Sequence, residues 1–304
     1  MYFPVAGVEV SPFVPPLFAF VVSFFTSMGG VSGAFLLLPF QMSGLGYTNP
    51  SVSATNQLYN IVAVPSGVYR YVKEGRMVWP LAVAIAAGTL PGVLAGAFIR
   101  VICLPDPRPF KLFVAAVLLY IGLKMILDLQ KQKKATAASV KQGAVVSAGK
   151  PGNFHVEVKE FSLRRISYLF QGEVHICPTS GVFLLSTIVG VIGGIYGVGG
   201  GAIIAPFLIS WYRLPIHTTS GAALMGTFLT SVAGVAFYTL IAPLFPEQAV
   251  SPDWMLGLLF GIGGFAGMYF GARCQKFVPA AAIKWMLGLL LLATSFKYVF
   301  DYLS

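Results

Sequence analysis

Eight apolar segments follow one another along the chain, and polar stretches separate them. Most contain the roughly 20 residues that an α-helix needs to cross the hydrocarbon core of a bilayer. The segments are residues 13–43, 51–70, 78–101, 110–129, 180–212, 217–243, 254–273 and 281–302. This pattern predicts an all-α polytopic membrane protein with membrane regions at residues 1–130 and 179–304.

A polar insert at residues 131–178 joins the two membrane regions. Polar and apolar residues alternate through Phe154–Phe161, and a period of two is typical of strands. We therefore expect a small extramembrane β-hairpin or meander, preceded by a flexible stretch from Lys131 to Gly152. On this interpretation His155 and His175 lie on the strand surface and do not bind a metal.

The second membrane region repeats the first. A shift of 167 residues places Gly30-Val31-Ser32-Gly33 on Gly197-Val198-Gly199-Gly200 without a gap, and it pairs Ser53 with Ser220 and Tyr71 with Tyr238. A shift of 175 residues places Gly88, Gly92 and Gly96 on Gly263, Gly267 and Gly271. We interpret the chain as two homologous units of four segments each.

Glycines interrupt the first segment of each unit, at residues 29–33 and 197–201. In the first unit the pieces on either side of the break are about 22 and 15 Å long at 1.5 Å per residue. Neither piece spans a core of about 30 Å alone, and together they are long for a straight crossing. Each segment is therefore either a discontinuous spanning helix or a re-entrant hairpin that turns back at its glycines.

Charge helps to choose between these two arrangements. Apart from Lys124 and Lys297, the 18 basic residues lie in loops or near segment ends. Of these, 11 lie on the better side if all eight segments cross, and 15 do so if the broken segments turn back with the N-terminus outside. Because basic residues concentrate in cytoplasmic loops, the count favours hairpins. Each half then crosses three times, so the halves are expected to be inverted and the insert at 131–178 to be cytoplasmic.

Composition excludes several other classes of protein. The chain is 57% hydrophobic and 10% charged, whereas soluble domains carry about 25% charged residues. The net charge of +10 is spread between apolar segments, which argues against nucleic-acid binding. Cys103, Cys177 and Cys274 show no metal or redox spacing, so no metal and no cofactor are expected.

The glycine breaks are the candidate site. Unpaired backbone at membrane depth requires a protein-lined or watered cavity, and the helix that starts after each break offers free N–H groups and a positive dipole end. Neutral polar residues within the next segments add further donors, which suit a small anion that must be released again. The candidate residues are Gly30, Ser32, Gly33, Ser53, Thr55, Asn56, Gln57, Gly197, Gly199, Gly200, Gly201, Thr219, Ser220 and Thr227. Lys124 and Lys297, near helix ends, are expected to snorkel to the interface.

The glycine-rich string Gly199–Pro206 and its degenerate copy Ser32–Pro39 resemble the TauE/SafE sulfite exporter family, as does the small polar stretch Thr218–Ala223. The resemblance covers both halves but not the insert. It implies a transporter of the bacterial inner membrane for sulfite, sulfonates, other sulfur-containing anions or organic acids. Because Ser32 and Ala34 depart from the glycine pattern, we expect the two half-sites to differ.

These observations predict a secondary carrier for a small anion, with membrane lipid as its surroundings and a homo-oligomer left open. An anion channel and a carrier for small organic carboxylates remain alternatives, because broken helices could build either. A membrane enzyme is disfavoured because paired carboxylates, Cys–His sets and metal clusters are missing from the sequence. A receptor that signals through the insert is a further alternative.

Overall fold

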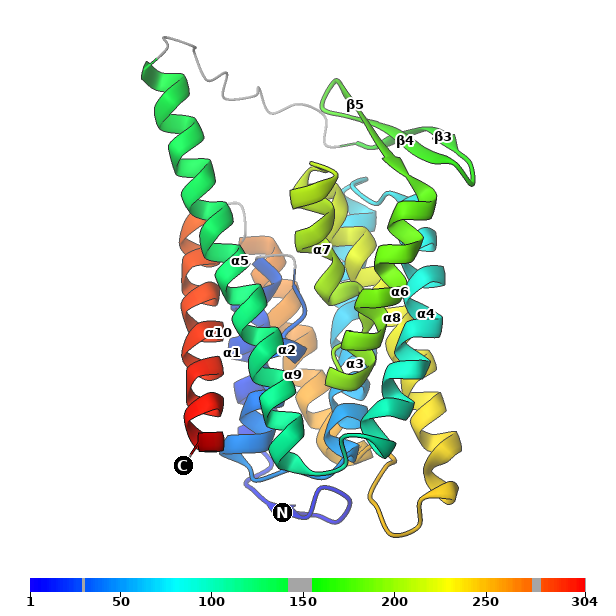
Figure 1. Cartoon of the computed structure of the whole chain (residues 1–304), viewed down its shortest axis with the longest axis vertical. Coiled ribbons are helices and arrows are strands. Elements are labelled where there is room, and N and C mark those ends of the chain that lie inside the picture. The colour runs from blue at the N-terminus through cyan, green and yellow to red at the C-terminus, as the bar shows by residue number, and fades with distance from the viewer. Residues whose placement is uncertain (29–30, 142–154, 275–279, 304) are drawn as a thin grey trace.

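The computed structural model describes residues 1–28, 31–141, 155–274 and 280–303. The chain forms an elongated helical bundle with a small sheet at one end and both termini at the other (Figure 1). We call these the sheet end and the terminal end. Six helices run along the bundle, each with at least 21 residues, which is about 32 Å. They are α3 (Ser51–Lys73), α4 (Trp79–Ile102), α5 (Pro107–Lys141), α8 (Ile216–Ile241), α9 (Trp254–Cys274) and α10 (Ala280–Leu303).

The first glycine-broken segment forms a hairpin that enters from the terminal end. It consists of α1 (Val14–Met28) and α2 (Ala34–Pro39), and α2 continues as the π-helical turn Phe40–Gly44. The rings of Phe18 and Phe40 stack with centroids 3.6 Å apart, so the two arms run side by side in opposite directions. The chain leaves where it entered, because the Asn49 amide donates a hydrogen bond to the carbonyl of Val5.

The second broken segment forms a hairpin that enters from the sheet end. Helix α6 (Thr179–Tyr196) runs into the bundle and α7 (Gly200–Trp211) runs back (Figure 1). Tyr212, which follows α7, lies against Gly181 in the first turn of α6, where an added Cβ would be 2.5 Å from the tyrosine hydroxyl. Of the two arrangements that the sequence leaves open, both segments therefore adopt the hairpin.

Apolar length alone does not distinguish a helix that crosses the bundle from a helix that belongs to a hairpin. Among the described residues, four helices are long and apolar enough to cross a membrane: Trp79–Ile102, Thr179–Tyr196, Ile216–Leu244 and Trp254–Cys274. The 18 residues of Thr179–Tyr196 satisfy this criterion, yet α7 returns the chain to the sheet end.

Helices from the two membrane regions interleave. Helix α1 packs along α9, α4 along α6, and α5 along α10, while α3 and α8 contact each other in the centre. Glycines allow the closest of these approaches: an added Cβ at Gly267 would lie 2.3 Å from the carbonyl oxygen of Phe20 in α1. At Gly92 it would lie 2.3 Å from the carbonyl oxygen of Thr187 in α6. Small residues at such positions let helix backbones meet in membranes.

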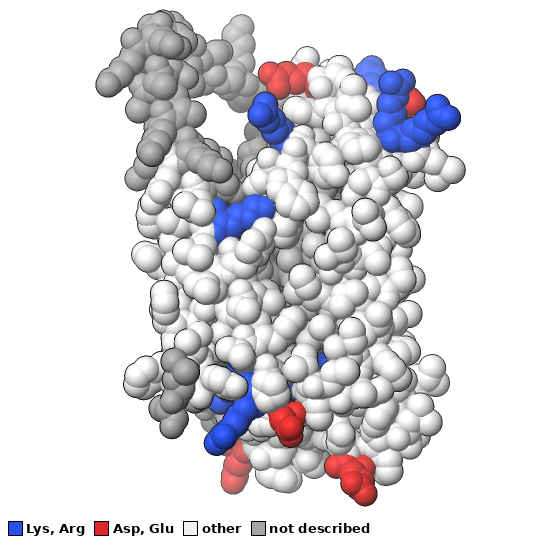
Figure 2. Space-filling model, in the orientation of Figure 1, with Lys and Arg blue, Asp and Glu red and all other residues white. Residues whose placement is uncertain are grey.

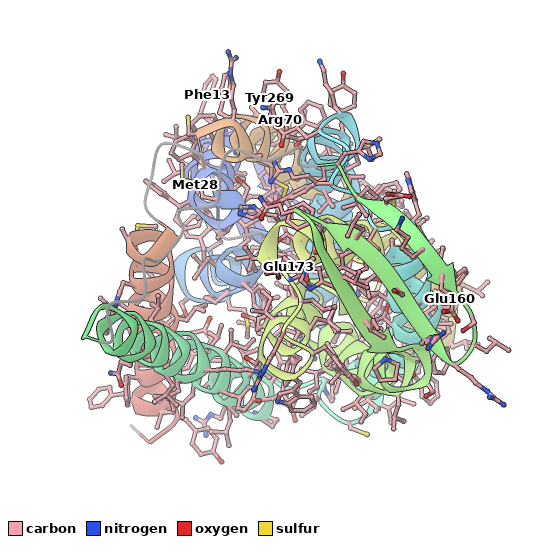
Figure 3. The ribbon with its side chains drawn as sticks, turned by 90° about the horizontal axis from the view of Figure 1, so that it is seen from above. Phe13, Met28, Arg70, Glu160, Glu173 and Tyr269 are labelled. Carbon is pink, nitrogen blue, oxygen red and sulfur yellow. The ribbon has the colours of Figure 1, made fainter. Side chains whose placement is uncertain are left out.

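The insert forms the predicted meander. Strands β3 (Glu157–Phe161), β4 (Arg165–Phe170) and β5 (Glu173–Pro178) pair antiparallel in the order β3-β4-β5. Seen from above, the sheet lies over α4 and α6, with Glu160 near its outer edge (Figure 3). The buried Tyr168 hydroxyl hydrogen-bonds the Thr218 hydroxyl at 2.9 Å, which attaches the sheet to the start of α8.

Two features differ from the expected pattern. The stretch 131–152 begins as a continuation of α5, which remains helical to Lys141, and residues 142–154 lie outside the described part. Near the N-terminus, β1 (Tyr2–Phe3) and β2 (Val8–Glu9) form a short antiparallel ladder that the apolar pattern does not predict.

Charged side chains gather at the two ends of the bundle, and the surface between them is almost uncharged on the face that Figure 2 shows. At the sheet end, Glu74 forms ion pairs with Arg70 and Arg76, and Arg165 pairs with Glu160 at 2.7 Å. An uncharged belt between charged ends is what a protein within a bilayer requires.

Candidate functional site

The tips of the two hairpins meet inside the bundle. At the end of α6, the Tyr196 hydroxyl donates a hydrogen bond of 2.8 Å to the carbonyl oxygen of Phe35 in the first turn of α2. The two aromatic rings are tilted against each other with centroids 5.8 Å apart. The structure therefore brings together the two glycine breaks, which are more than 160 residues apart in the chain.

Helix α3 passes beside both breaks, and two of its asparagines bridge them. Asn56 Nδ2 donates to the carbonyl of Ala34 at 3.0 Å and to that of Gly197 at 3.1 Å. Asn60 lies one turn later on the same face. Its Nδ2 donates to the carbonyl of Val198 at 3.0 Å, and its Oδ1 accepts from the Ser32 hydroxyl at 2.5 Å. Each asparagine thus hydrogen-bonds both hairpins.

The second break depends on glycine conformation. Gly197 ends α6 with φ +83°, and Gly199 precedes α7 with φ +74°, both in the left-handed region where side chains are strained. An added Cβ at Gly197 would also lie 2.5 Å from the Cα of Ser53. Ser53 donates from its hydroxyl to the carbonyl of Ile195 at 3.1 Å, which fixes the end of α6 against α3.

Helix α7 then begins at Gly200, and its first N–H groups have no partners within the helix. Thr227 of α8 lies beside this start, because an added Cβ at Gly201 would be 2.8 Å from the Thr227 hydroxyl oxygen. Ser231, one turn later, lies 2.9 Å from the Cβ position of Gly199. The start of α7 is therefore surrounded by hydroxyl groups.

Two buried polar side chains near this helix start are unsatisfied. Neither Gln57 Nε2 nor Gln57 Oε1 has a hydrogen-bond partner among the described residues, and the same holds for the Ser231 hydroxyl. Both residues are fully buried. Gln57 lies against Gly234, one turn after Ser231 on α8. Because a buried unsatisfied amide costs free energy, these groups indicate a site for a polar ligand.

The first break is built mainly from side chains. Gly33 is close to Tyr59, whose hydroxyl would be 2.4 Å from an added Cβ, and that hydroxyl hydrogen-bonds Ser23 at 2.6 Å. Gln41, which follows α2, donates from Nε2 to Asn56 Oδ1 at 3.3 Å. Our sequence interpretation missed Gln41, although a single amide within an apolar run was the signal.

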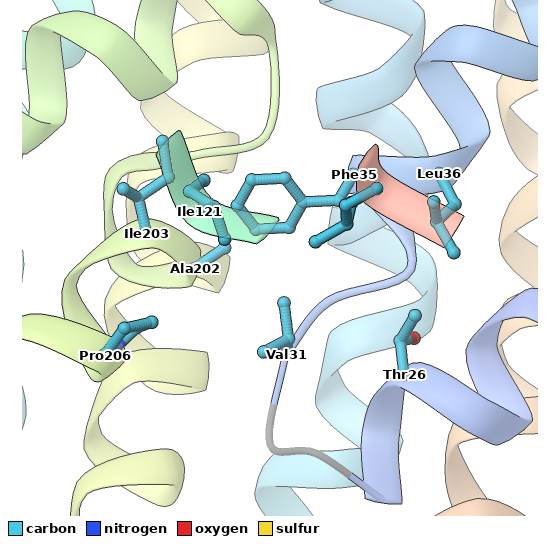
Figure 4. A pocket seen from close by; sticks show the side chains of 9 residues that line it. Thr26, Val31, Phe35, Leu36, Ile121, Ala202, Ile203 and Pro206 are labelled. Carbon is cyan, nitrogen blue, oxygen red and sulfur yellow. The ribbon is translucent and has the colours of Figure 1, made fainter. Parts of the chain in front are cut away.

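An apolar pocket lies between the hairpins, and one residue each of α5 and α10 contributes to its wall (Figure 4). The Thr26 hydroxyl is a polar group in its wall, and it has no hydrogen-bond partner in the described structure. The lining residues are Thr26, Val31, Phe35, Leu36, Ile121, Ala202, Ile203, Pro206 and Leu291. Val31 and Ala202 adjoin the two breaks, so the pocket has room for an apolar substituent of a ligand bound at the breaks.

Several candidate residues lie elsewhere. Thr55 accepts a hydrogen bond from the Asp253 backbone N–H at 2.9 Å and so holds the start of α9. Thr219 and Ser220 donate to Pro215 and Ile216 in the first turn of their own helix. The structure does not bring these three side chains to the breaks. Gly30 lies outside the described residues.

The two lysines within apolar segments are also away from the breaks. Lys124 Nζ lies 3.8 Å from the ring centroid of Phe207, a cation–π contact near the sheet end. Lys297 is exposed. The residues that meet at the breaks are thus neutral, and no cluster of three metal-ligating residues occurs in the described part of the chain.

Comparison with known protein sequences identifies a family. The sequence model of the family "Sulfite exporter TauE/SafE" matches residues 16–298, almost the whole chain. A probable membrane transporter protein of Xylella fastidiosa (strain Temecula1) is 23% identical over 279 residues, which cover 90% of both chains. The probable membrane transporter protein YunE of Bacillus subtilis is 19% identical over 90% of this chain and 92% of its own.

A third relative is similar over a shorter region. The probable membrane transporter protein YdhB of Bacillus subtilis is 31% identical over 115 residues, which are 37% of this chain and 43% of YdhB. No solved structure matches the chain. Because the family match extends through both membrane regions, the chain is a multi-pass membrane protein that belongs to the TauE/SafE sulfite exporter family.

Proposed function

We propose that this protein is a secondary carrier for a small anion, a sulfur-containing oxyanion or sulfonate such as sulfite, which binds at the start of α7. One observation carries the proposal: Asn56 and Asn60 each hydrogen-bond both hairpins at the glycine breaks. A ligand that displaces these bonds would change how the two hairpins are held together. Binding would thereby be coupled to a change in packing.

The chemistry of the site supports an anion as cargo. The α7 start provides backbone N–H groups and the positive end of a helix dipole. Gln57 Nε2 and the Ser231 hydroxyl are further donors without partners among the described residues. The candidate residues at the breaks carry no formal charge, so the site would attract an anion without holding it too strongly for release.

We further propose that the halves are inverted repeats that alternate access to this site. The hairpins enter from opposite ends, and the contacts are reciprocal: α1 packs on α9 as α6 packs on α4. Tyr71 of α3 packs against Gly221 of α8, and Tyr238 of α8 clusters with Ala54 of α3. The shift of 167 residues relates Tyr71 to Tyr238 and Ala54 to Gly221, so the second contact is the counterpart of the first. Carriers of this kind bind substrate at broken helices near the midplane.

Orientation follows from charge. With the sheet end in the cytoplasm, most basic residues would face the cytoplasm, as the positive-inside rule expects. We therefore propose that the insert at 131–178 lies on the cytoplasmic side, and that the membrane is the bacterial inner membrane, as the family resemblance implies.

The direct test is transport by the full chain in proteoliposomes loaded for counterflow. Sulfite, sulfate, thiosulfate, methanesulfonate and acetate are compared as substrates. Gln57→Leu should lower uptake at least tenfold without loss of thermal stability, because it removes two unsatisfied polar atoms. Gln130→Leu, on an exposed position of α5, is the matched control.

Each alternative outcome has a meaning. Transport of acetate alone would replace the sulfur anion by an organic carboxylate. Unitary currents without counterflow would show a channel. If Gln57→Leu transports every anion as well as Gln130→Leu does, the proposed site is wrong.

A further inference from the structure

Arg100, in the last turn of α4 at the terminal end, is the largest fully buried side chain among the described residues. Its Nη1 donates to the carbonyl of Leu104, and its guanidinium lies 3.7 Å from the ring centroid of Phe110. Its Nε and Nη2 atoms are buried and have no hydrogen-bond partner in the described structure. These two nitrogens form one edge of the planar guanidinium, which can bind an oxyanion through two parallel hydrogen bonds.

The carboxylates of Asp253, Asp106 and Glu247 in this region do not pair with Arg100. Asp253 is buried, and its two oxygens accept hydrogen bonds from the backbone N–H groups of Ala6 and Leu256. Asp106 and Glu247 line an open surface pocket at the terminal end and form no ion pair with Arg100. A buried cation without a carboxylate is costly, so the positive charge at this position calls for a counter-ion.

Residues beside Arg100 reach that surface pocket on one side and the end of α6 on the other. Leu104, whose carbonyl it contacts, directly precedes Pro105 in the pocket wall. On the inner side, Tyr238 belongs to one buried cluster with Ala97 and Val101, which neighbour Arg100 on α4. The hydroxyl of Tyr238 donates to the carbonyl of Gly194 at 3.3 Å, three residues before the break at Gly197. Arg100 therefore lies close both to the pocket wall and to the tyrosine that contacts the end of α6.

At the sheet end the corresponding arginine, Arg76, has different partners. There Arg76 lies 4.8 Å from the ring centroid of Tyr71, the tyrosine that the shift of 167 residues pairs with Tyr238. Arg76 is ion-paired with Glu74 and contacts His217 Nδ1 at 3.3 Å. One arginine thus has a carboxylate partner within the chain, whereas Arg100 has none among the described residues.

We propose that Arg100 is an anion-capture site that receives the oxyanion at the terminal end before it reaches the glycine breaks. This inference rests on the proposed anion transport and names a second, earlier site on the same path. The Nε and Nη2 edge binds two oxygens of the anion, while Phe110 and Leu104 hold the guanidinium in place.

The test compares Arg100→Gln and Arg100→Lys with Arg108→Gln, an exposed arginine near the same end of the bundle. Sulfite uptake is measured in proteoliposomes, separately from each face. Arg100→Gln should raise the half-saturating sulfite concentration at the terminal face by about 10- to 100-fold, since a charge-assisted bidentate contact is lost. Arg100→Lys keeps the positive charge but not the edge of two nitrogens. Its half-saturating sulfite concentration should therefore lie between those of the unmodified protein and Arg100→Gln. At the sheet face the change should stay below about threefold.

A binding measurement separates this inference from the proposed function. Calorimetry of the full chain with sulfite should show binding that survives Gln57→Leu and disappears in the Gln57→Leu, Arg100→Gln double variant. If the unmodified protein binds sulfite in this way but transports none of the anions, the carrier is refuted and the capture site stands. If Gln57→Leu removes all binding, or if Arg100→Gln lowers only the melting temperature and leaves half-saturation as in Arg108→Gln, Arg100 is structural and the inference fails.

Discussion

The two hairpins occupy comparable places in the fold but are stabilised by different means. In the second hairpin, left-handed glycines reverse the chain and a 12-residue helix, α7, begins directly after them. In the first hairpin, α2 has six residues, Gly33 has an ordinary helical φ of −61°, and the Ser23, Ser32 and Tyr59 side chains surround the break. Backbone donors are therefore concentrated at the second break. The first break packs against the second and contributes mainly side chains.

The difference follows from which helix lies beside each break. At positions matched by the shift of 167 residues, α3 has Asn56 and Gln57 where α8 has Ala223 and Leu224. The amides of α3 reach both hairpins, whereas α8 contributes hydroxyls to the second hairpin. The expectation that the half-sites differ rested on Ser32 and Ala34, but the larger difference lies in the neighbouring helices.

The largest effect is expected from Gly201→Ala. The added Cβ would lie 2.1 Å from the Ala223 carbonyl oxygen and 2.5 Å from Thr227 N, both backbone atoms that cannot move alone. Overpacking should lower the free energy of unfolding by about 1–3 kcal/mol and abolish sulfite uptake. Gly33→Ala meets the Tyr59 and Ser23 hydroxyl oxygens, which are side-chain atoms and not backbone, so it should do less damage. Equal damage from both, in thermal unfolding and uptake, would contradict the contrast between the hairpins.

Asn56→Ala should have the next largest effect. It removes a hydrogen bond to each hairpin and leaves buried carbonyl oxygens without that donor, at a cost of about 2–4 kcal/mol. Ser53→Ala, on the same helix face, loses a bond to the second hairpin alone and should cost about 1 kcal/mol. Chemical or thermal denaturation in detergent checks the order. A larger loss for Ser53→Ala would mean that Asn56 does not join the hairpins.

Ser231→Ala should separate binding from stability. The hydroxyl has no hydrogen-bond partner among the described residues, so its removal should leave the melting temperature unchanged or slightly higher. Half-saturation for sulfite should rise about three- to tenfold through loss of one donor. Thr230→Val is the control, because that hydroxyl bonds the Gly226 carbonyl of its own helix at 2.7 Å. Unchanged half-saturation in Ser231→Ala would remove Ser231 from the site.

The smallest perturbation tests the opposite entry of the hairpins. Cys103 is exposed at the terminal end, whereas Cys177 is buried in the sheet and its pKa is raised to about 11 by that burial, so it stays an unreactive thiol at neutral pH. With Cys177 and Cys274 replaced by Ser, an impermeant maleimide should label Cys103 in intact cells. Leu163→Cys, at a site 92% exposed in the sheet, should react only after lysis. The reverse pattern would invert the proposed orientation.

The apolar pattern was sufficient to predict the class of protein, its membrane helices and its insert. Segment length, low charge and the alternation near Phe154–Phe161 predicted membrane helices and a β insert, because these signals are local and periodic. The glycine strings located both breaks for the same reason. Charge counting favoured hairpins over spans, and the fold adopts hairpins.

Contacts between distant residues required the tertiary structure. Asn56 and Asn60 were predicted on one face of a helix, but only the fold shows that their amides reach carbonyls 141 and 138 residues away. Thr55, Thr219 and Ser220 were candidate site residues on the same sequence grounds as Asn56. In the fold they hydrogen-bond other partners, away from the breaks. Arg100 lies at the end of the segment predicted at 78–101, and only the fold shows that Phe110 and Leu104 contact it and that it is buried. Periodicity and composition record which face of an element is apolar, whereas the packing of helices from both halves decides which polar groups that face meets.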